Sequence, residues 1–441
     1  NPVLTDDGMI MAYISDMDSK DINDTAVCYS KKGDGGAYEL GKQIDASDYA
    51  DTDVVIDGTG NAAAAAWTRI MSNLEKSEGE EAGAEDLHTI MSSTEIMAGI
   101  YNGTDFTATQ LTDNSIPDMS PVVAANGNKA IVAWRSLYAS DMENPLDFDG
   151  RDNIMYSIYD GASWSEAKCL YDGSIDKVNA LNAKMLSDET SAITYQINIK
   201  DTENSEVYCA IIDQSGNIIN NIRLTNDENK NENPQITSVV FPDDIERFII
   251  GWNTARVIDE IEEESTIKLS AMDNKGVLYP QFEKEIRSTD GLSRYNGFKF
   301  TKGAENLEDL SILWTEPKQD NGLGTESIYK DIIWGRRFIK DSDGSISPKI
   351  KLIELDDNNV ADFFDSYVSD TKEVNLSLLI SDYSDGEPQA KLATAKSGYK
   401  NNLIVEEIYF SRDDLMPGLD MPVLFSLYND SVEPISKITI D

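Results

Sequence analysis

The sequence has few basic residues, one histidine, three cysteines and no long apolar run. Its 441 residues include 37 lysines and arginines against 80 aspartates and glutamates, which gives a formal net charge of −43. A surface this negative repels phosphate backbones and anionic lipids, so we expect no nucleic-acid partner. Because a membrane-spanning helix needs roughly 18 or more consecutive apolar residues, we also expect no membrane insertion.

The scarce cysteine and histidine residues exclude several kinds of site. Cys28, Cys169 and Cys209 are too few and too scattered for a disulfide framework or a zinc site. Cys28 and Cys209 lie in strand-like segments, where we predict small buried thiols. His88 lies in an acidic stretch without a serine or cysteine nucleophile motif nearby, so we predict an ordinary loop residue. No Gly-rich phosphate loop is present, and no motif identifies a catalytic residue.

A repeat of about 60 residues runs along the chain. Each copy begins with an apolar segment, a turn, and a second apolar segment that ends in an aromatic residue. The aligned column, whose last member belongs to a degenerate seventh copy, contains Tyr13, Trp67, Trp134, Tyr195, Trp252, Trp314 and Leu379. We predict that the alanine run at 62–66 is a strand, because small side chains let neighbouring sheets approach closely.

Two further segments complete each copy, so four strands recur seven times. Units of four strands cannot bury both faces alone, and stacking around an axis solves this. We therefore predict an all-β fold, a seven-bladed β-propeller of four-stranded blades over residues 1–410, with 403–410 as the last strand. The exception is 68–93, which could hold one or two helical turns. A string of β-sandwich domains is the alternative that the four-strand period disfavours.

After the propeller, residues 411–441 are predicted to form a linker and a β-hairpin. The segment MPVLFSLYNDSVEPISKITID resembles the opening hairpin of the immunoglobulin-like modules that bacterial surface and cell-adhesion proteins carry in tandem. This resemblance implies a bacterial extracellular or cell-surface protein built of several modules. The alternative is a terminal strand pair that packs on the propeller.

The predicted connections differ between the two faces of the propeller. First-to-second and third-to-fourth turns are short, whereas second-to-third connections look long in every repeat, most of all at 68–93 and 135–152. Long loops on one side of a rigid scaffold are where recognition usually occurs. If the chain binds a ligand, we expect the binding site on that face. Solvated acidic loops without a ligand are the alternative.

Three arginines follow the aromatic column closely, and they form the candidate binding set: Arg69, Arg135 and Arg256. If they converge, their paired N–H donors could hold a carboxylate or a sulfate. Local ion pairs with the abundant carboxylates are the alternative. Sialidases are similar in being propellers with an arginine triad and Asp-box turns, but DGASW at 160–164 lacks the Ser-x-Asp-x-Gly spacing. We expect no sialidase activity.

One acidic loop offers a candidate metal site, formed by Asp147, Asp149 and Asp152. Alternating carboxylates beside a glycine supply the oxygen ligands that calcium prefers, so calcium is the one cofactor we consider. A weaker set is Asp341 and Asp343. Neither loop completes an EF-hand, and Asp-Gly is also ordinary turn chemistry.

The repeat and the predicted one-sided loops favour a non-catalytic recognition or adhesion module of a bacterial extracellular protein. We expect it to be a monomer and to bind a glycan or a protein. The first alternative is a carbohydrate-active enzyme, a glycosidase or lyase that uses paired carboxylates, for which 80 acidic residues leave every pairing open. The second alternative is a structural spacer.

Overall fold

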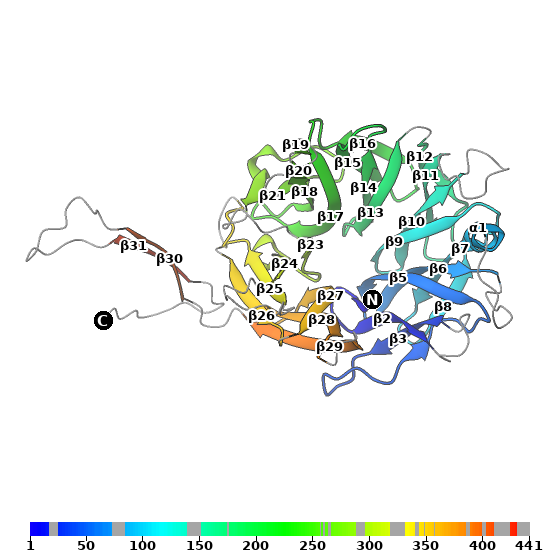
Figure 1. The fold of residues 1–441 in the computed structure, drawn as a ribbon, viewed down its shortest axis with the longest axis horizontal. Helices are drawn as coiled ribbons and strands as arrows, with labels where there is room; N and C mark the ends of the chain where they lie inside the picture. Colours follow the sequence, from blue (N-terminus) through cyan, green and yellow to red (C-terminus); the bar gives the residue numbers. More distant parts are fainter. Residues whose placement is uncertain are drawn as a thin grey trace, which may run out of the picture.

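The computed structural model of the chain is a ring of β-sheets around an axis (Figure 1). It describes residues 1–16, 25–72, 84–138, 151–173, 176–255, 257–258, 261–262, 266–287, 296–317, 331–339, 344–347, 349–356, 358–384, 389–398, 403–409 and 424–429.

The first four blades each contain four antiparallel strands, ordered from the axis outward as they occur in the chain. Blade 1 contains β1 (Val3–Leu4), β2 (Ile10–Asp16), β3 (Thr25–Lys31) and β4 (Lys42–Gln43). Blade 2 contains β5 (Ala50–Thr59), β6 (Ala62–Ile70), β7 (Thr94–Tyr101) and β8 (Phe106–Gln110). Blade 3 contains β9 (Asp118–Asn126), β10 (Lys129–Leu137), β11 (Asp152–Tyr159) and β12 (Lys168–Tyr171). Blade 4 contains β13 (Lys177–Met185), β14 (Ser191–Asn198), β15 (Ser205–Ile212) and β16 (Ile218–Arg223).

The last three blades complete the ring. Blade 5 contains β17 (Lys230–Val240), β18 (Glu246–Ala255), β21 (Thr266–Met272) and β22 (Lys284–Arg287), with a small hairpin of β19 (Val257–Ile258) and β20 (Ile261–Glu262). Blade 6 contains β23 (Asn296–Phe300), β24 (Ser311–Pro317), β25 (Asp331–Arg337) and β26 (Ile350–Glu354). Blade 7 contains β27 (Asn359–Val368), β28 (Glu373–Asp382) and β29 (Gln389–Gly398). The 3-10 turns η1 (Pro280–Phe282) and η2 (Leu307–Asp309) lie in blades 5 and 6.

The ring of seven blades confirms the predicted fold class, with blades 4 and 5 joined into one eight-stranded sheet by a parallel pairing of β15 with β17. The alanine run is part of β6, and its residues 63–66 are buried, as predicted. The tryptophans of the aromatic column are buried between neighbouring sheets, where their burial contributes much of the inter-blade core. Cys28 and Cys209 are buried thiols, also as predicted.

The predicted helical turns in 68–93 are present as α1 (Ala84–Ser92). His88 is exposed but lies on this helix, so its prediction as a loop residue is wrong. In the described part of the chain, no helix has the length and apolarity that crossing a membrane requires.

The prediction of a fourth strand in blade 7 is wrong. β30 (Leu403–Tyr409) pairs with β31 (Leu424–Asn429) instead of with β29, so the described sheet of blade 7 has three strands. Figure 1 shows this hairpin apart from the ring. A strand's backbone edge can pair with either neighbour, and the sequence of 403–410 does not tell β29 and β31 apart as partners.

The prediction of long second-to-third connections holds in some blades only. They span 71–93 in blade 2 and 138–151 in blade 3, against first-to-second turns of 60–61 and 127–128. In blade 4 the second-to-third connection is only 199–204. The expectation of long connections in every repeat is therefore wrong, because gaps in the hydrophobic pattern overestimate a loop where strand residues are polar.

The ring closes where the first inner strand meets the last. The backbone N–H of Leu4 in β1 donates to Asp365 Oδ2 in β27 at 2.8 Å. Lys302, which follows β23, donates to the carbonyl oxygen of Leu4 at 2.6 Å. Blades 6, 7 and 1 are thus joined at the axis by polar contacts from inner strands.

Candidate binding site on the propeller axis

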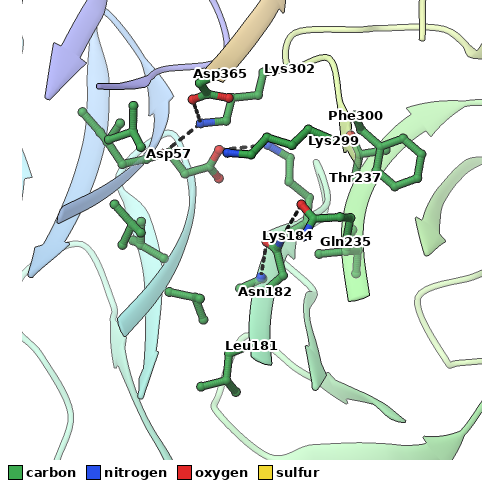
Figure 2. A pocket seen from close by; sticks show the side chains of 17 residues that line it. Asp57, Leu181, Asn182, Lys184, Gln235, Thr237, Lys299, Phe300, Lys302 and Asp365 are labelled. Carbon is green, nitrogen blue, oxygen red and sulfur yellow. Dashed lines mark hydrogen bonds and ion pairs between the residues drawn. The ribbon is translucent and has the colours of Figure 1, made fainter. Parts of the chain in front are cut away.

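A pocket of about 260 Å³ lies on the axis of the ring, and all seven inner strands contribute to it (Figure 2). It is lined by Val3, Val55, Ile56, Asp57, Val122, Val123, Leu181, Asn182, Ala183, Lys184, Gln235, Ile236, Thr237, Lys299, Phe300, Lys302 and Asp365. Ligand pockets for drug-sized molecules are typically about 300–1,000 Å³, so this one has room for a small group.

A β-bulge shapes the inner strand of each blade that has tryptophan in the aromatic column. In blades 2, 3, 5 and 6, two residues of the inner strand lie opposite the single tryptophan of the second strand. The bulges include the left-handed residues Asp53, Ser120 and Asn233, with φ of 54°, 53° and 54°. A bulge bends the strand and redirects the side chains that follow it.

The residues directly after these four bulges all line the pocket: Val55, Val122, Gln235 and Lys299. We call them the rim. Each inner strand runs toward its first-to-second turn, so the rim lies on the long-connection side of the residues that follow it. Blades 2 and 3 contribute its two apolar members and blades 5 and 6 its two polar ones.

Next to the polar side of the rim lies an amide pair. Asn182 Nδ2 donates to Gln235 Oε1 at 3.1 Å, and Gln235 Nε2 donates to the carbonyl oxygen of Pro234 at 3.3 Å. These bonds hold the two side chains against the pocket wall. The pocket is therefore amphipathic, with valines on one side and amides and an ammonium group on the other.

Nearer the first-to-second turns, lysines and carboxylates form a network that we call the floor. Lys184 Nζ donates to Asp6 Oδ2 at 2.7 Å and to Asp57 Oδ1 at 3.0 Å, which links blade 4 to blades 1 and 2. Asp57 also accepts the backbone N–H of Ala125 in blade 3 at 2.8 Å. One lysine thus joins four blades across the axis.

A second lysine completes the floor. Lys302 Nζ donates to Asp365 Oδ2 at 2.9 Å and to the carbonyl oxygens of Leu4 and Ile56. Asp365 is almost fully buried, with a side chain that is 4% exposed, and it needs this partner. Both floor lysines are therefore committed to contacts between blades.

The floor carboxylates differ in pKa. Burial alone would raise the pKa of Asp57, but the Lys184 and Lys302 ammonium groups outweigh it and lower that pKa. Asp365 behaves the same way, with Lys302 and Lys299 outweighing burial. Asp6 is the exception, since burial and the charge of Asp57 raise its pKa to about 6.

Two of the predicted arginines lie in ion pairs with carboxylates of their own neighbourhood. Arg69 is buried and holds Asp51 through Nε at 2.7 Å and Nη2 at 3.0 Å, while Nη1 contacts Asp45 at 2.7 Å. Asp51 also accepts the indole N–H of Trp67 at 3.1 Å. These bonds satisfy the guanidinium through local ion pairs, which is the alternative that the sequence left open.

Arg135 and Asp152, which came from two different predicted sites, contact each other. Arg135 Nη2 lies 2.7 Å from Asp152 Oδ2, and that oxygen also accepts the backbone N–H of Val178 at 2.9 Å. The pair joins blades 3 and 4. The structure therefore places Asp152 in an ion pair beside the calcium loop that the sequence proposed.

The remaining candidates, Arg256, Asp147, Asp149, Asp341 and Asp343, lie outside the described residues. Within the part of the chain that the structure describes, no group of three or more histidine, cysteine, aspartate or glutamate side chains is placed to hold a metal ion. The arginine set as a binding site and the calcium site stay predictions.

The axial pocket was not predicted from the sequence. Three of its polar members, Asn182, Gln235 and Lys299, are isolated residues in strands and match no motif. The only signal was positional, because Gln235 and Lys299 precede the tryptophans of their blades by a similar interval. Using it requires the bulge register, which only the structure supplies.

No family model matches the chain, and no curated protein sequence does. Similar solved structures include a Trypanosoma rangeli sialidase in complex with sialic acid, at 10% identity and a TM-score of 0.42 over 87% of this chain and 58% of that one. A neuraminidase-like protein from A/bat/Guatemala/164/2009 matches at 10% identity and a TM-score of 0.42, over 79% of this chain and 88% of that one. The polysaccharide lyase Uly1 matches at 9% identity and a TM-score of 0.47, over 88% of this chain and 87% of that one.

This chain therefore spans 58% of the length of the sialidase. Identities this low concern the fold alone. The activities named are those of the other proteins.

Proposed function

We propose that the chain is a non-catalytic recognition module of an extracellular protein and binds a glycan or a protein. The ligand approaches the face of the long connections in blades 2 and 3, and a small group of it enters the axial pocket below. The observation that carries this proposal is the pocket itself, which all seven blades line and which is amphipathic. A rigid, largely preformed pocket with a few polar groups is typical of ligand sites.

The state of the axial carboxylates favours binding over hydrolysis. A glycosidase needs one carboxyl group with a raised pKa as acid and a second one as base or nucleophile. Asp57 and Asp365, which line the pocket, both have a lowered pKa and are each held by a lysine. Asp6 has a raised pKa, but it bonds to Lys184 and does not line the pocket. These carboxylates hold the blades together.

The test is a binding screen on the whole chain with arrays of glycans and of extracellular proteins. A variant in which Gly-Ser linkers replace 73–83 and 139–150 should lose the ligands found, while its melting temperature stays close to that of the parent. A matched control carries Gln214→Ala and Lys275→Ala in exposed turns on the opposite face and should bind normally.

Each other outcome points to a different function. Ligands that bind the trimmed variant unchanged would contradict the proposed face. Turnover of a polysaccharide by the parent chain would establish the enzyme alternative. If the parent binds nothing on any array, the structural spacer is the remaining alternative.

A further inference from the structure

Lys299 occupies a position that the other comparable blades fill without a charge. The residue after the bulge, opposite the alanine, glycine or leucine that precedes the tryptophan, is valine in blades 2 and 3 and glutamine in blade 5. In blade 6 it is Lys299, paired with Leu313. Packing at this level therefore needs no ammonium group.

Lys299 also differs from the two floor lysines in its contacts. Among the described residues it has no hydrogen-bond or ion-pair partner, whereas Lys184 and Lys302 contact carboxylates at 2.7–3.0 Å. Its Nζ lies over the ring of Phe363, 3.8 Å from the ring centroid. Figure 2 shows the side chain extending toward the middle of the pocket without a marked interaction.

The charge of Lys299 destabilises the folded protein in the absence of a ligand. Burial lowers its pKa to about 8, although Asp365 pulls in the other direction. Among the described residues no carboxylate bonds directly to this ammonium group, although Asp365 acts on it through space. An oxyanion that reaches Lys299 therefore stabilises its charge, since charge-assisted hydrogen bonds are the strong ones. The pocket is lined by three lysines and two carboxylates, so it is locally less negative than a chain with a net charge of −43.

We infer that Lys299 binds the carboxylate or sulfate group of an acidic ligand in the axial pocket, an inference that rests on the proposed recognition function. The amides of Asn182 and Gln235 border the bound group, and Val55 and Val122 face its apolar side. The volume of about 260 Å³ admits one terminal unit such as a hexuronate, with the rest of the ligand outside.

The experiment uses the whole chain and three probes: D-glucuronate, inorganic sulfate and neutral methyl glucoside. Calorimetric titration at pH 7 measures affinity for the parent, Lys299→Met, Lys299→Arg and the control Lys42→Met, which removes an exposed lysine. Trace acetylation with mass spectrometry measures protection of each lysine by each probe. We expect Lys299→Met to lower the affinity for glucuronate or sulfate at least tenfold and Lys299→Arg to restore part of that affinity. We also expect the bound anion to slow acetylation of Lys299 but not of Lys42.

The outcomes separate this inference from the proposed function. Equal affinity of the parent and Lys299→Met for both anions, or equal protection by methyl glucoside, would overturn the inference. If array ligands still bind Lys299→Met normally, only the anion site is wrong and the recognition module stands. If no array ligand binds the parent but the anions protect Lys299, the site stands and the proposed function falls. The anion that protects Lys299, glucuronate or sulfate, shows whether the acidic group of the ligand is a carboxylate or a sulfate.

Discussion

The floor and the rim of the axial pocket both contain lysines, but these lysines have different surroundings and different roles. Lys302 in the floor is surrounded by Asp365 and two carbonyl oxygens. Lys299, three positions earlier, has among the described residues no hydrogen-bond partner, and its Nζ lies over the rings of Phe363 and Phe364. A buried charge with partners fastens parts of a structure together, whereas a buried charge without them costs stability. The contrast separates residues that hold the ring from a residue available to a ligand.

The largest effect should follow from removing a floor lysine. Lys184→Met leaves Asp57, whose side chain is 6% exposed, without its counter-ion, and breaking one side of a buried pair costs about 3–5 kcal/mol. Denaturant unfolding measures the loss. The control Lys42→Met, in an exposed pair with Asp105, should change the free energy of unfolding by about 1 kcal/mol or less.

Where Lys184→Met does not fold, a second variant still tests the floor. Asp57→Asn combined with Lys184→Met removes both charges, so the pair should recover much of the stability that the single change loses. A double variant that fails to fold as Lys184→Met does would show that the unpaired charge of Asp57 is not the cause of the loss.

The rim should respond in the opposite direction. Lys299→Met removes a desolvated ammonium group, and the lowering of its pKa from 10.5 to about 8 corresponds to a gain on the order of 3 kcal/mol at neutral pH. Because the unfolded chain binds the proton more tightly, stability of the parent should rise between about pH 8 and 10.5 and that of the variant should not. Thermal unfolding at pH 7 and pH 9.5 checks both statements. If Lys299→Met is less stable than the parent, Lys299 holds the blades together as the floor lysines do.

Anion binding should follow the same titration. The groups that act on Lys299 are Asp365 on β27, Lys302 after β23 and the amino group of Asn1. As pH rises from 7 to 9 through a pKa of about 8, roughly nine-tenths of the charge is lost, so affinity for glucuronate should fall about tenfold. Calorimetry across this range measures it. Affinity that is flat from pH 7 to 9 would exclude Lys299 as the anion's partner.

The parts of the molecule that repeat could be predicted, and the parts that depend on register could not. Trp67, Trp134 and Trp314 recur because each fills the space between neighbouring sheets, and they revealed the blades. The partner of Arg69 is Asp51, eighteen positions away on the adjacent strand, and no local pattern selects it among 80 acidic residues. Lys299 was invisible for the same reason, because a lysine in a strand indicates a solvated edge until the bulge is known.

The smallest expected effect distinguishes the two carboxylates that share Lys184. The raised pKa of Asp6, about 6, means that the folded protein binds a proton more tightly than the unfolded chain, so this group stabilises the fold below about pH 4 and that stability is lost as pH rises through 6. Asp6→Asn removes the loss and still accepts a hydrogen bond from Lys184. Relative to the parent, the variant should therefore gain about 1 kcal/mol between pH 5 and pH 7 in denaturant unfolding. Asp57→Asn should instead be less stable than the parent by a nearly constant amount from pH 5 to 7, and the difference should shrink as pH falls below about 4, since the lowered pKa of Asp57 makes its ionised form the stabilising one. If both variants show the same pH dependence, Lys184 is shared equally, and the floor has no preferred pair.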